Sequence, residues 1–182
     1  MKRVLVLFAF ALLVTLPALC QGYDNEVPRL DVAGYFSHLT GDVGKNGWEG
    51  SATFRPSPRF GLVGDVGGTY GTDQILGVKF SSNIHTFMFG PRVFFPLENH
   101  EKWTPYAHLL FGVGHTNEKV NLLGLDQSDT SFAWALGGGI DYQFAEKFRV
   151  RPIQVELLHT NFFGSGESRA RIGVGLVYQF GM

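Results

Sequence analysis

The stretch SFAWALGGGIDYQF, residues 131–144, carries the clearest structural signal in the chain. Bulky side chains occupy most of the even positions from Phe132 to Phe144, whereas small or polar residues occupy the odd positions. Successive side chains of a β-strand point to opposite faces of a sheet, so this period of two is typical of a strand with one apolar face. We therefore predict a β-strand across these residues.

Seven further stretches show a similar alternation between turn residues. They are Leu30–Ser37, Trp48–Arg55, Phe60–Tyr70, His85–Phe95, Trp103–His115, Phe148–His159 and Arg169–Phe180. Residues 56–58, 96–102 and 145–147 make short turns, and residues 40–47, 71–83, 116–130 and 161–168 make longer polar loops. Strands joined alternately by short turns and long loops favour an all-β fold, an eight-stranded antiparallel up-and-down transmembrane β-barrel.

Two of these strands contain a proline. Pro91 removes a backbone donor from the strand at residues 85–95, which predicts a bulge or an adjusted register there. In the strand at residues 148–159, the polar positions change from odd, at Arg149 and Arg151, to even, at Gln154 and Glu156. This change of parity predicts a β-bulge near Pro152.

The composition is unusual for a soluble domain. The 182 residues fit one domain, with 24 glycines, 17 phenylalanines and 17% charged residues, against about 25% charged residues in soluble domains. No apolar run beyond the N-terminal region is long enough for a spanning helix. A lipid-facing barrel fits this composition, although a soluble glycine-rich β-sandwich also remains open. The formal net charge of −1 gives no electrostatic footprint for nucleic acid.

Residues 1–20 have the three-part layout of a secretory signal peptide. Lys2 and Arg3 precede an apolar stretch from Val4 to Leu16, and residues 18–20 offer a cleavage site. We expect a signal peptide over residues 1–20, a short segment over 21–28 and a barrel domain over 29–182. A permanent membrane anchor and a lipoprotein acylated on Cys20 are the alternatives.

Alternation alone does not say whether the apolar face meets lipid or a protein core. Small residues on the polar face favour a crowded lumen, and aromatic residues near the strand ends favour girdles at the membrane interfaces. Charges facing that lumen must be paired, because an isolated buried charge is costly. The predicted lumen charge network comprises Asp31, Glu49, Arg55, Asp65, Arg92, Asp141, Arg151, Glu156 and Arg171. The alternative is a set of unrelated surface charges.

The last strand resembles the C-terminal assembly signal of outer-membrane barrels, with Gly175, Tyr178 and Phe180 at the matching positions. The match is incomplete, because Gly173 replaces a polar residue and two residues follow Phe180. The segments TFMFGPR (86–92) and ALGGGIDY (135–142) are similar to the small OmpA-like outer-membrane β-barrel family. This resemblance implies a bacterial outer-membrane location, surrounding lipid and lipopolysaccharide, and recognition by the barrel-assembly machinery. It implies no particular activity.

The sequence offers little for catalysis or ligand binding. The six histidines lack close metal-ligand spacing, and residues 137–139 lie within a strand, so neither a metal nor a cofactor is expected. An enzyme similar to the lipid A deacylases is an alternative at His159 and Glu156, but Asn161 stands where the serine is expected, and Ser165 and Ser168 fall in the predicted loop.

A narrow pore is another alternative, although eight strands leave an interior just wide enough for side chains. We predict instead a non-enzymatic integral outer-membrane barrel with a structural, adhesive or interaction role through its external loops. No catalytic residue and no nucleic acid partner are expected, and the external partner is unknown.

Overall fold

A computed structural model describes residues 29–41, 45–75, 78–97, 99–100, 102–120 and 125–180. The predicted signal peptide and the segment 21–28 lie outside the described residues, so both stay predictions. Among the described residues, no helix is long and apolar enough to cross a membrane.

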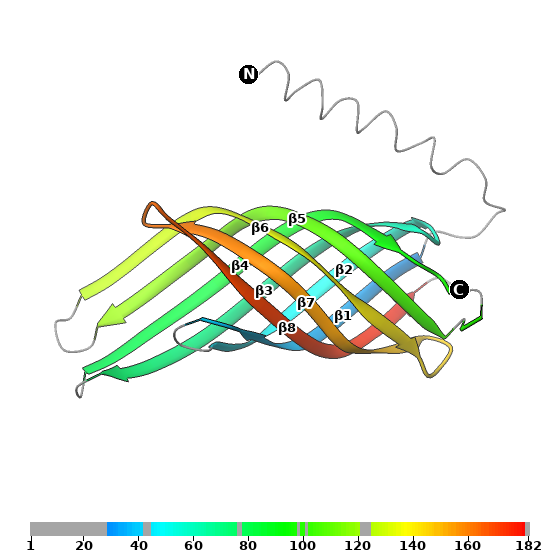
Figure 1. Cartoon of the computed structure of the whole chain (residues 1–182), viewed down its shortest axis with the longest axis horizontal. Helices are drawn as coiled ribbons and strands as arrows, with labels where there is room; N and C mark the ends of the chain where they lie inside the picture. The colour runs from blue at the N-terminus through cyan, green and yellow to red at the C-terminus, as the bar shows by residue number, and fades with distance from the viewer. Residues whose placement is uncertain are drawn as a thin grey trace, which may run out of the picture.

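Eight antiparallel strands form a closed barrel, in which each strand pairs with the next and β8 pairs with β1 (Figure 1). This confirms the predicted fold class. The strands are β1 (Arg29–Leu39), β2 (Lys45–Ser57), β3 (Phe60–Ile75), β4 (Val78–Phe94), β5 (Trp103–Val120), β6 (Leu125–Gln143), β7 (Phe148–Phe162) and β8 (Ser165–Phe180).

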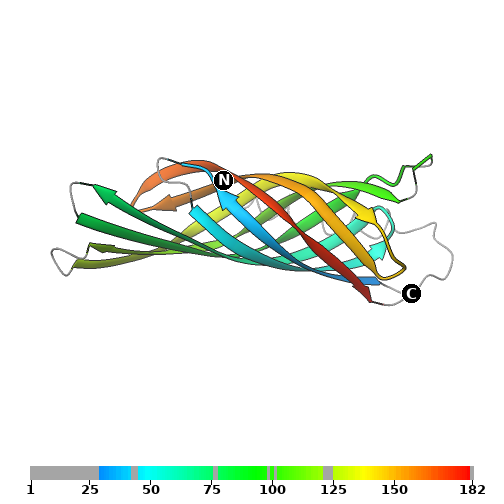
Figure 2. The same cartoon turned by 90° about the horizontal axis from the view of Figure 1, so that it is seen from below.

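The two ends of the barrel differ. One end, here called the turn end, carries Arg29, Phe180 and the connections after β2, β4 and β6. The opposite end, here called the hairpin end, carries the connections after β1, β3, β5 and β7. The β3–β4 and β5–β6 hairpins reach farthest at the hairpin end (Figures 1 and 2).

The four predicted long loops are wrong in extent. β3 and β4 stay paired out to Ile75 and Val78, and β5 and β6 stay paired out to Val120 and Leu125. The remaining connections are similarly short, because β2 begins at Lys45 and β8 begins at Ser165. The polar residues of these segments lack apolar alternation, but the backbone ladder continues without it.

The two proline predictions have opposite outcomes. The register shifts between Arg151 and Gln154 on β7, which confirms the bulge near Pro152. The bulge or adjusted register expected at Pro91 is wrong, because Pro91 pairs with Leu62 in an unbroken β3–β4 register. On the β5 side, pairing is interrupted at residues 90–91 and resumes in the same register at Arg92, so the barrel accommodates the missing donor locally.

Exposure alternates along the strands and separates an apolar outer surface from a buried interior. Phe87 and Phe89 of β4 are 69% and 70% exposed, whereas Met88 between them is 3% exposed. Large apolar side chains are exposed on all eight strands, and the buried set is dominated by polar and charged residues. This is the reverse of a soluble protein, and it matches a barrel whose outside meets lipid.

Candidate functional site: the barrel lumen

The lumen is filled by side chains, and its contents change along the barrel axis. Charged and polar residues dominate the buried set, and a separate apolar cluster reaches from Val63, near the turn end of β3, to Leu39 at the hairpin end of β1. All nine residues of the predicted charge network are buried in this interior, each with 6% exposure or less. Their role as a charge network in a membrane stays a prediction.

The middle of the lumen holds three carboxylates around one arginine. Arg171 of β8 donates from Nε to Glu156 Oε2 at 2.9 Å, and its Nη2 also contacts that oxygen. Its Nε lies 3.2 Å from Glu49 Oε1, and its Nη2 lies 3.8 Å from Asp65 Oδ1. Arg171 therefore lies between three acidic side chains from three other strands.

Neutral groups complete this central cluster. Tyr35 donates to Asp65 Oδ2 at 3.0 Å, and the His108 Nε2 atom lies 2.9 Å from Glu156 Oε1. Arg92 Nη2 lies 3.3 Å from His108 Nδ1, and a guanidinium only donates. The Nδ1 atom therefore accepts, which leaves the Nε2–H to point at Glu156.

A second group lies closer to the turn end. Arg151 makes a two-point contact with Asp141, with Nε–Oδ1 at 2.7 Å and Nη2–Oδ2 at 3.1 Å. Its Nη1 donates to Gln154 Oε1 at 2.8 Å, and the guanidinium lies 4.5 Å from the ring centroid of Tyr106. Such paired geometry is the strong form of a charge-assisted hydrogen bond.

A third group surrounds Asp31. Arg55 Nη1 lies 3.3 Å from Asp31 Oδ2, and Arg149 Nη1 lies 3.9 Å from the same oxygen. Arg149 also donates to Gln179 at 3.0 Å, and the Arg55 guanidinium lies 4.0 Å from the ring centroid of Phe94. The predicted network left out five residues, although each lies at an inward-facing position of its strand. They are Tyr35, Tyr106, His108, Arg149 and Gln154.

The ionic residues are unevenly shared along the axis. The central cluster has three carboxylates around Arg171, whereas the groups near the turn end have two carboxylates, Asp31 and Asp141, for Arg55, Arg149 and Arg151. Arg92 contacts His108 of the central cluster and Thr53. An acidic excess in the middle therefore faces a basic excess at the turn end. Breaking a buried pair costs about 3–5 kcal/mol, so the geometry strongly couples these strands.

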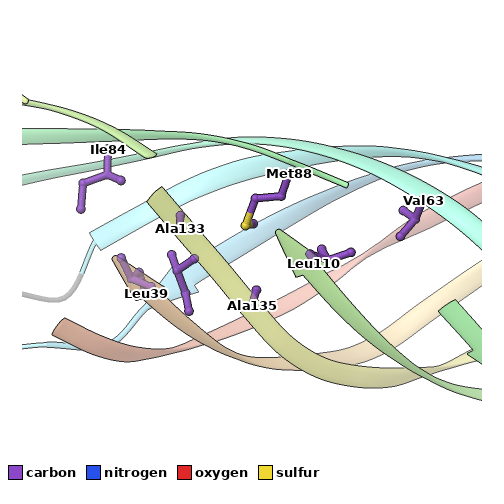
Figure 3. Packing of buried hydrophobic residues seen from close by; sticks show 8 residues of the cluster. Leu39, Val63, Ile84, Met88, Leu110, Ala133 and Ala135 are labelled. Atoms are coloured by element: carbon purple, nitrogen blue, oxygen red, sulfur yellow. The ribbon is translucent and has the colours of Figure 1, made fainter. Parts of the chain in front are cut away.

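A cluster of apolar side chains also lies inside the barrel (Figure 3). Its buried members are Leu39, Val63, Ile84, Met88, Leu110, Ala133, Ala135 and Leu158, with Phe162 packed against them. The sequence pattern predicted small and charged side chains in the lumen, and this cluster adds larger apolar ones. The sequence indicated one member of this cluster, because Met88 lies on the same face of its strand as Thr86 and Arg92.

The residues of the predicted assembly signal lie along β8 beside β1. Tyr178 and Phe180 have ring centroids 4.5 Å apart, and Phe180 is exposed on the outer surface. Gly175 lies opposite Tyr35, and a Cβ at this position would overlap the backbone oxygen of Gly34 and the Tyr35 side chain. Gly175 thus permits a close approach between the last and first strands, whereas recognition by assembly machinery stays a prediction.

For the enzymatic alternative, the structure brings Ser168 next to His159 but places Glu156 away from both. Ser168, expected in a loop, lies on β8 opposite His159, with Oγ 2.9 Å from Nδ1. The tight turn at Phe163 and Gly164, with φ of 51° and 76°, sets this register. Glu156, however, points into the lumen toward Arg171, away from the outer surface that carries His159. These three residues therefore do not assemble into a catalytic set. Among the described residues, no group of three or more histidine, cysteine or acidic side chains could hold a metal ion.

Taken together, an apolar exterior, an ionic interior and complete strand closure define a transmembrane β-barrel. The chain belongs to the family of the outer membrane protein beta-barrel domain, whose model matches residues 6–180. Members of this family are proteins of the bacterial outer membrane. A search of curated proteins gives no sequence match.

Solved structures of outer-membrane barrels share the fold at low sequence identity. Ail of Yersinia pestis has a TM-score of 0.58 and 17% identity, with 85% of this chain and 99% of that chain covered. Neisserial surface protein A has a TM-score of 0.61 and 10% identity, covering 85% and 97%. The N-terminal barrel of Pseudomonas aeruginosa OprF has a TM-score of 0.54 and 16% identity, covering 84% and 97%.

Proposed function

We propose that the protein is a non-enzymatic outer-membrane barrel with a closed lumen, which presents its hairpin end outside the cell. Its role is envelope support, adhesion or interaction with an external partner. The supporting observation is that fully buried side chains such as Arg92, Arg151 and Leu110 fill the lumen while two hairpins extend at one end. A filled lumen leaves the protruding end as the place for contact with other molecules.

The proposed route to the membrane uses both ends of the chain. Residues 1–20 act as the export signal, and Gly175, Tyr178 and Phe180 act in recognition by the barrel-assembly machinery. Outer-membrane lipid and lipopolysaccharide then surround the apolar exterior. The exposed apolar residues on every strand support the lipid contact, because leaving them in water would be unfavourable.

The orientation rests on the extended hairpins. Outer-membrane barrels make their longer excursions on the outer side, and the β3–β4 and β5–β6 hairpins reach farthest at the hairpin end, so this end faces out in our proposal. The described polar residues Asn117, Ser128, Asp129 and Thr130 lie on the extended β5–β6 hairpin. Ail, which shares the fold, has been crystallised with the heparin analogue sucrose octasulfate, and this supports an adhesive role for the present barrel.

The direct test is topological labelling in intact cells. The chain has one cysteine, Cys20, within the proposed signal peptide, so Thr130→Cys and Lys147→Cys each introduce a single thiol into the mature protein. A membrane-impermeant maleimide should label the Thr130 variant in whole cells and the Lys147 variant after lysis alone. Labelling with the reverse pattern would place the hairpin end in the periplasm. Loss of cell adhesion on shortening the β5–β6 hairpin, with surface labelling retained, would support the adhesive role.

A narrow pore is the alternative that the packed lumen disfavours. Planar-bilayer recordings of the folded barrel should show no steady conductance at neutral pH. A reproducible conductance that changes on Leu110→Ala, which trims a fully buried lumen side chain, would establish the pore instead.

The lipid-modifying enzyme keeps one specific observation in its favour, the contact between His159 and Ser168. If Ser168 were a nucleophile, lipid A from expressing cells would lose an acyl chain, and Ser168→Ala would restore the original mass spectrum. Identical spectra with wild-type protein, the variant and no protein are the expected result.

A further inference from the structure

The lumen side chains at the turn end include hydrogen-bond donors that lack acceptors. Arg149 is the second residue of β7, and Gln179 is the penultimate residue of β8. Arg149 donates from Nη2 to Gln179 Oε1 at 3.0 Å. Its Nε and Nη1 atoms and the Gln179 Nε2 atom have no hydrogen-bond partner within the part of the chain that the structure describes. Both side chains are buried, and we call them the donor pair.

Buried donors are rarely left unpaired in native proteins, because an unmade hydrogen bond retains the cost of desolvation. Asp31 does not meet this need. Its Oδ2 atom lies 3.9 Å from Arg149 Nη1, beyond hydrogen-bond distance, and 3.3 Å from Arg55 Nη1. The donor pair therefore calls for a further acceptor, and a carboxylate suits a buried guanidinium best.

The donor pair lies at the opening of the lumen. Along β7 the exposure of the charged side chains falls from 6% at Arg149 to 1% at Arg151 and Glu156. Arg149 is also the first inward-facing residue of this strand, since Phe148 before it is exposed on the outer surface. An acceptor can thus approach the donor pair from the turn end without crossing the packed interior.

The stretch of chain that leads into β1 carries two carboxylates. β1 begins at Arg29, at the turn end of the barrel (Figure 1). The preceding residues 21–28 lie outside the described part of the chain, and their sequence is QGYDNEVP, with Asp24 and Glu26 as its charged residues. The connection of an acidic segment to this end of the barrel matches its charge to the donors that need an acceptor.

Glu26 is within reach of the donor pair. A chain covers at most about 3.6 Å per residue, so Glu26 lies no more than about 11 Å from Arg29 along the backbone. Asp31, two residues farther along β1, is the direct partner of Gln179 in the β1–β8 register. Neighbouring strands lie about 4.8 Å apart, and β8 separates β1 from β7, so Arg149 is about 10 Å away from β1. A chain that folds back beneath β8 can bring the Glu26 carboxylate to both donors.

We propose that the donor pair is a carboxylate-binding site whose ligand is Glu26, so that the segment before β1 covers the turn-end opening of the lumen. The Glu26 carboxylate accepts hydrogen bonds from Arg149 and Gln179, and it adds a negative charge where two guanidiniums share Asp31. The contact joins the start of the barrel to its last two strands, in addition to the β1–β8 ladder. The inference does not depend on which end of the barrel faces the outside.

The direct test is NMR of the arginine Nε–H groups in the folded barrel, with the chain from residue 21 in detergent micelles. Arg149→Lys assigns the signal of interest. Glu26→Gln should shift the Arg149 Nε–H signal and speed its exchange with water by about tenfold, because a charge-assisted hydrogen bond is lost. An unmoved signal with unchanged exchange would overturn the proposal.

Glu101→Gln is the matched control. Glu101 precedes β5, which is also two strands from β7 but three strands from β8, so it is farther from Gln179 than the segment before β1. The control should leave the Arg149 signal and its exchange rate unchanged. A response to Glu101→Gln equal to that of Glu26→Gln would overturn the assignment of the ligand.

A double-mutant cycle gives an energetic readout. Glu26→Gln should raise the unfolding equilibrium constant about tenfold in the wild-type barrel and leave it nearly unchanged in an Arg149→Met background. Equal increases in the two backgrounds would overturn the contact. Where Arg149→Met fails to fold, the NMR comparison decides, since Glu26 lies outside the strands of the barrel.

A soluble anion is the other source of the same chemistry. Sodium acetate or inorganic phosphate at millimolar concentration should leave the Arg149 signal of the wild-type barrel unchanged, because the site is occupied. In the Glu26→Gln variant, the same anions should move the signal back toward its wild-type position. Shifts of equal size in both proteins would show that the site takes free anions, and would overturn the assignment to the segment before β1.

Discussion

The two sections of the lumen stabilise the same barrel by different means. Around Arg171 the strands are joined by ion pairs and hydrogen bonds that depend on exact partners, whereas around Leu158 and Met88 they are joined by packing. A buried charge that loses its partner retains its desolvation cost, but a trimmed apolar side chain leaves only a cavity. Single substitutions should therefore cause larger losses in the ionic section than in the apolar section.

The largest loss is expected for Arg171→Met. This change removes the shared cation and leaves Glu49, Asp65 and Glu156 buried together, so the free energy of unfolding should fall by about 3–5 kcal/mol. Urea titration of the barrel in phospholipid vesicles, followed by heat-modifiable gel migration, measures the change. Adding Glu49→Gln and Asp65→Asn to this variant should recover part of the loss; no recovery would mean that the carboxylates do not depend on Arg171.

The apolar section is tested by a pair of adjacent residues on β7. Leu158 is 3% exposed in the cluster, and Leu157 is 42% exposed on the outside. Leu158→Ala should cost about 2–5 kcal/mol in the same urea titration, because it opens a cavity among packed side chains. Leu157→Ala faces lipid, which can fill the space, and should cost clearly less. Equal costs would contradict the assignment of Leu158 to the packed interior.

The smallest effect is expected for Glu49→Gln, compared with Glu156→Gln. Glu156 accepts hydrogen bonds from Arg171 and Gln154, so its neutralisation should cost about 1.5–3 kcal/mol. Within the described part of the chain, neither oxygen of Glu49 accepts a hydrogen bond; its Oε1 lies 3.2 Å from Arg171 Nε, and Arg171 also pairs with Glu156 and Asp65. Glu49→Gln should shift the free energy of unfolding by less than about 1 kcal/mol. A larger loss for Glu49 than for Glu156 would reverse the ranking of the two carboxylates.

Much of the fold could be predicted because alternation reports directly on the two faces of a strand. It located the eight strands and the parity change near Pro152, and it assigned Asp65 and Glu156 to the same side as Arg171. The alternation between apolar and polar residues is lost where a strand extends beyond the lipid, because neither face of the strand must then be apolar. For this reason the polar extensions of β3–β6 look like loops in the sequence.

The contacts between lumen side chains could not be predicted. An odd or even position along a strand shows which face of the sheet a side chain is on, but it does not show the height of that side chain along the barrel axis. The proximity of Tyr35 to Asp65, and of His108 to Glu156, depends on the register and stagger of strands far apart in the sequence. The contact between His159 and Ser168 likewise depends on a two-residue turn whose first residue, Phe163, has an unusual positive φ. Gly164 indicates a turn in the sequence, but nothing there indicates that the turn spans only two residues and begins at Phe163.

The uneven lengths of the strands give the rim at the hairpin end a sloping profile. β3 to β6 rise on one side as two paired hairpins, whereas β1 stops at Leu39 and β7 at Phe162 (Figure 2). If this end faces outward, as proposed, a bulky molecule that approaches the cell surface would meet the tall side first and reach the low side only by tilting. Neighbouring barrels or long sugar chains would therefore reach the low side of the rim more easily from one direction, so the two sides of this nearly cylindrical protein are not equivalent.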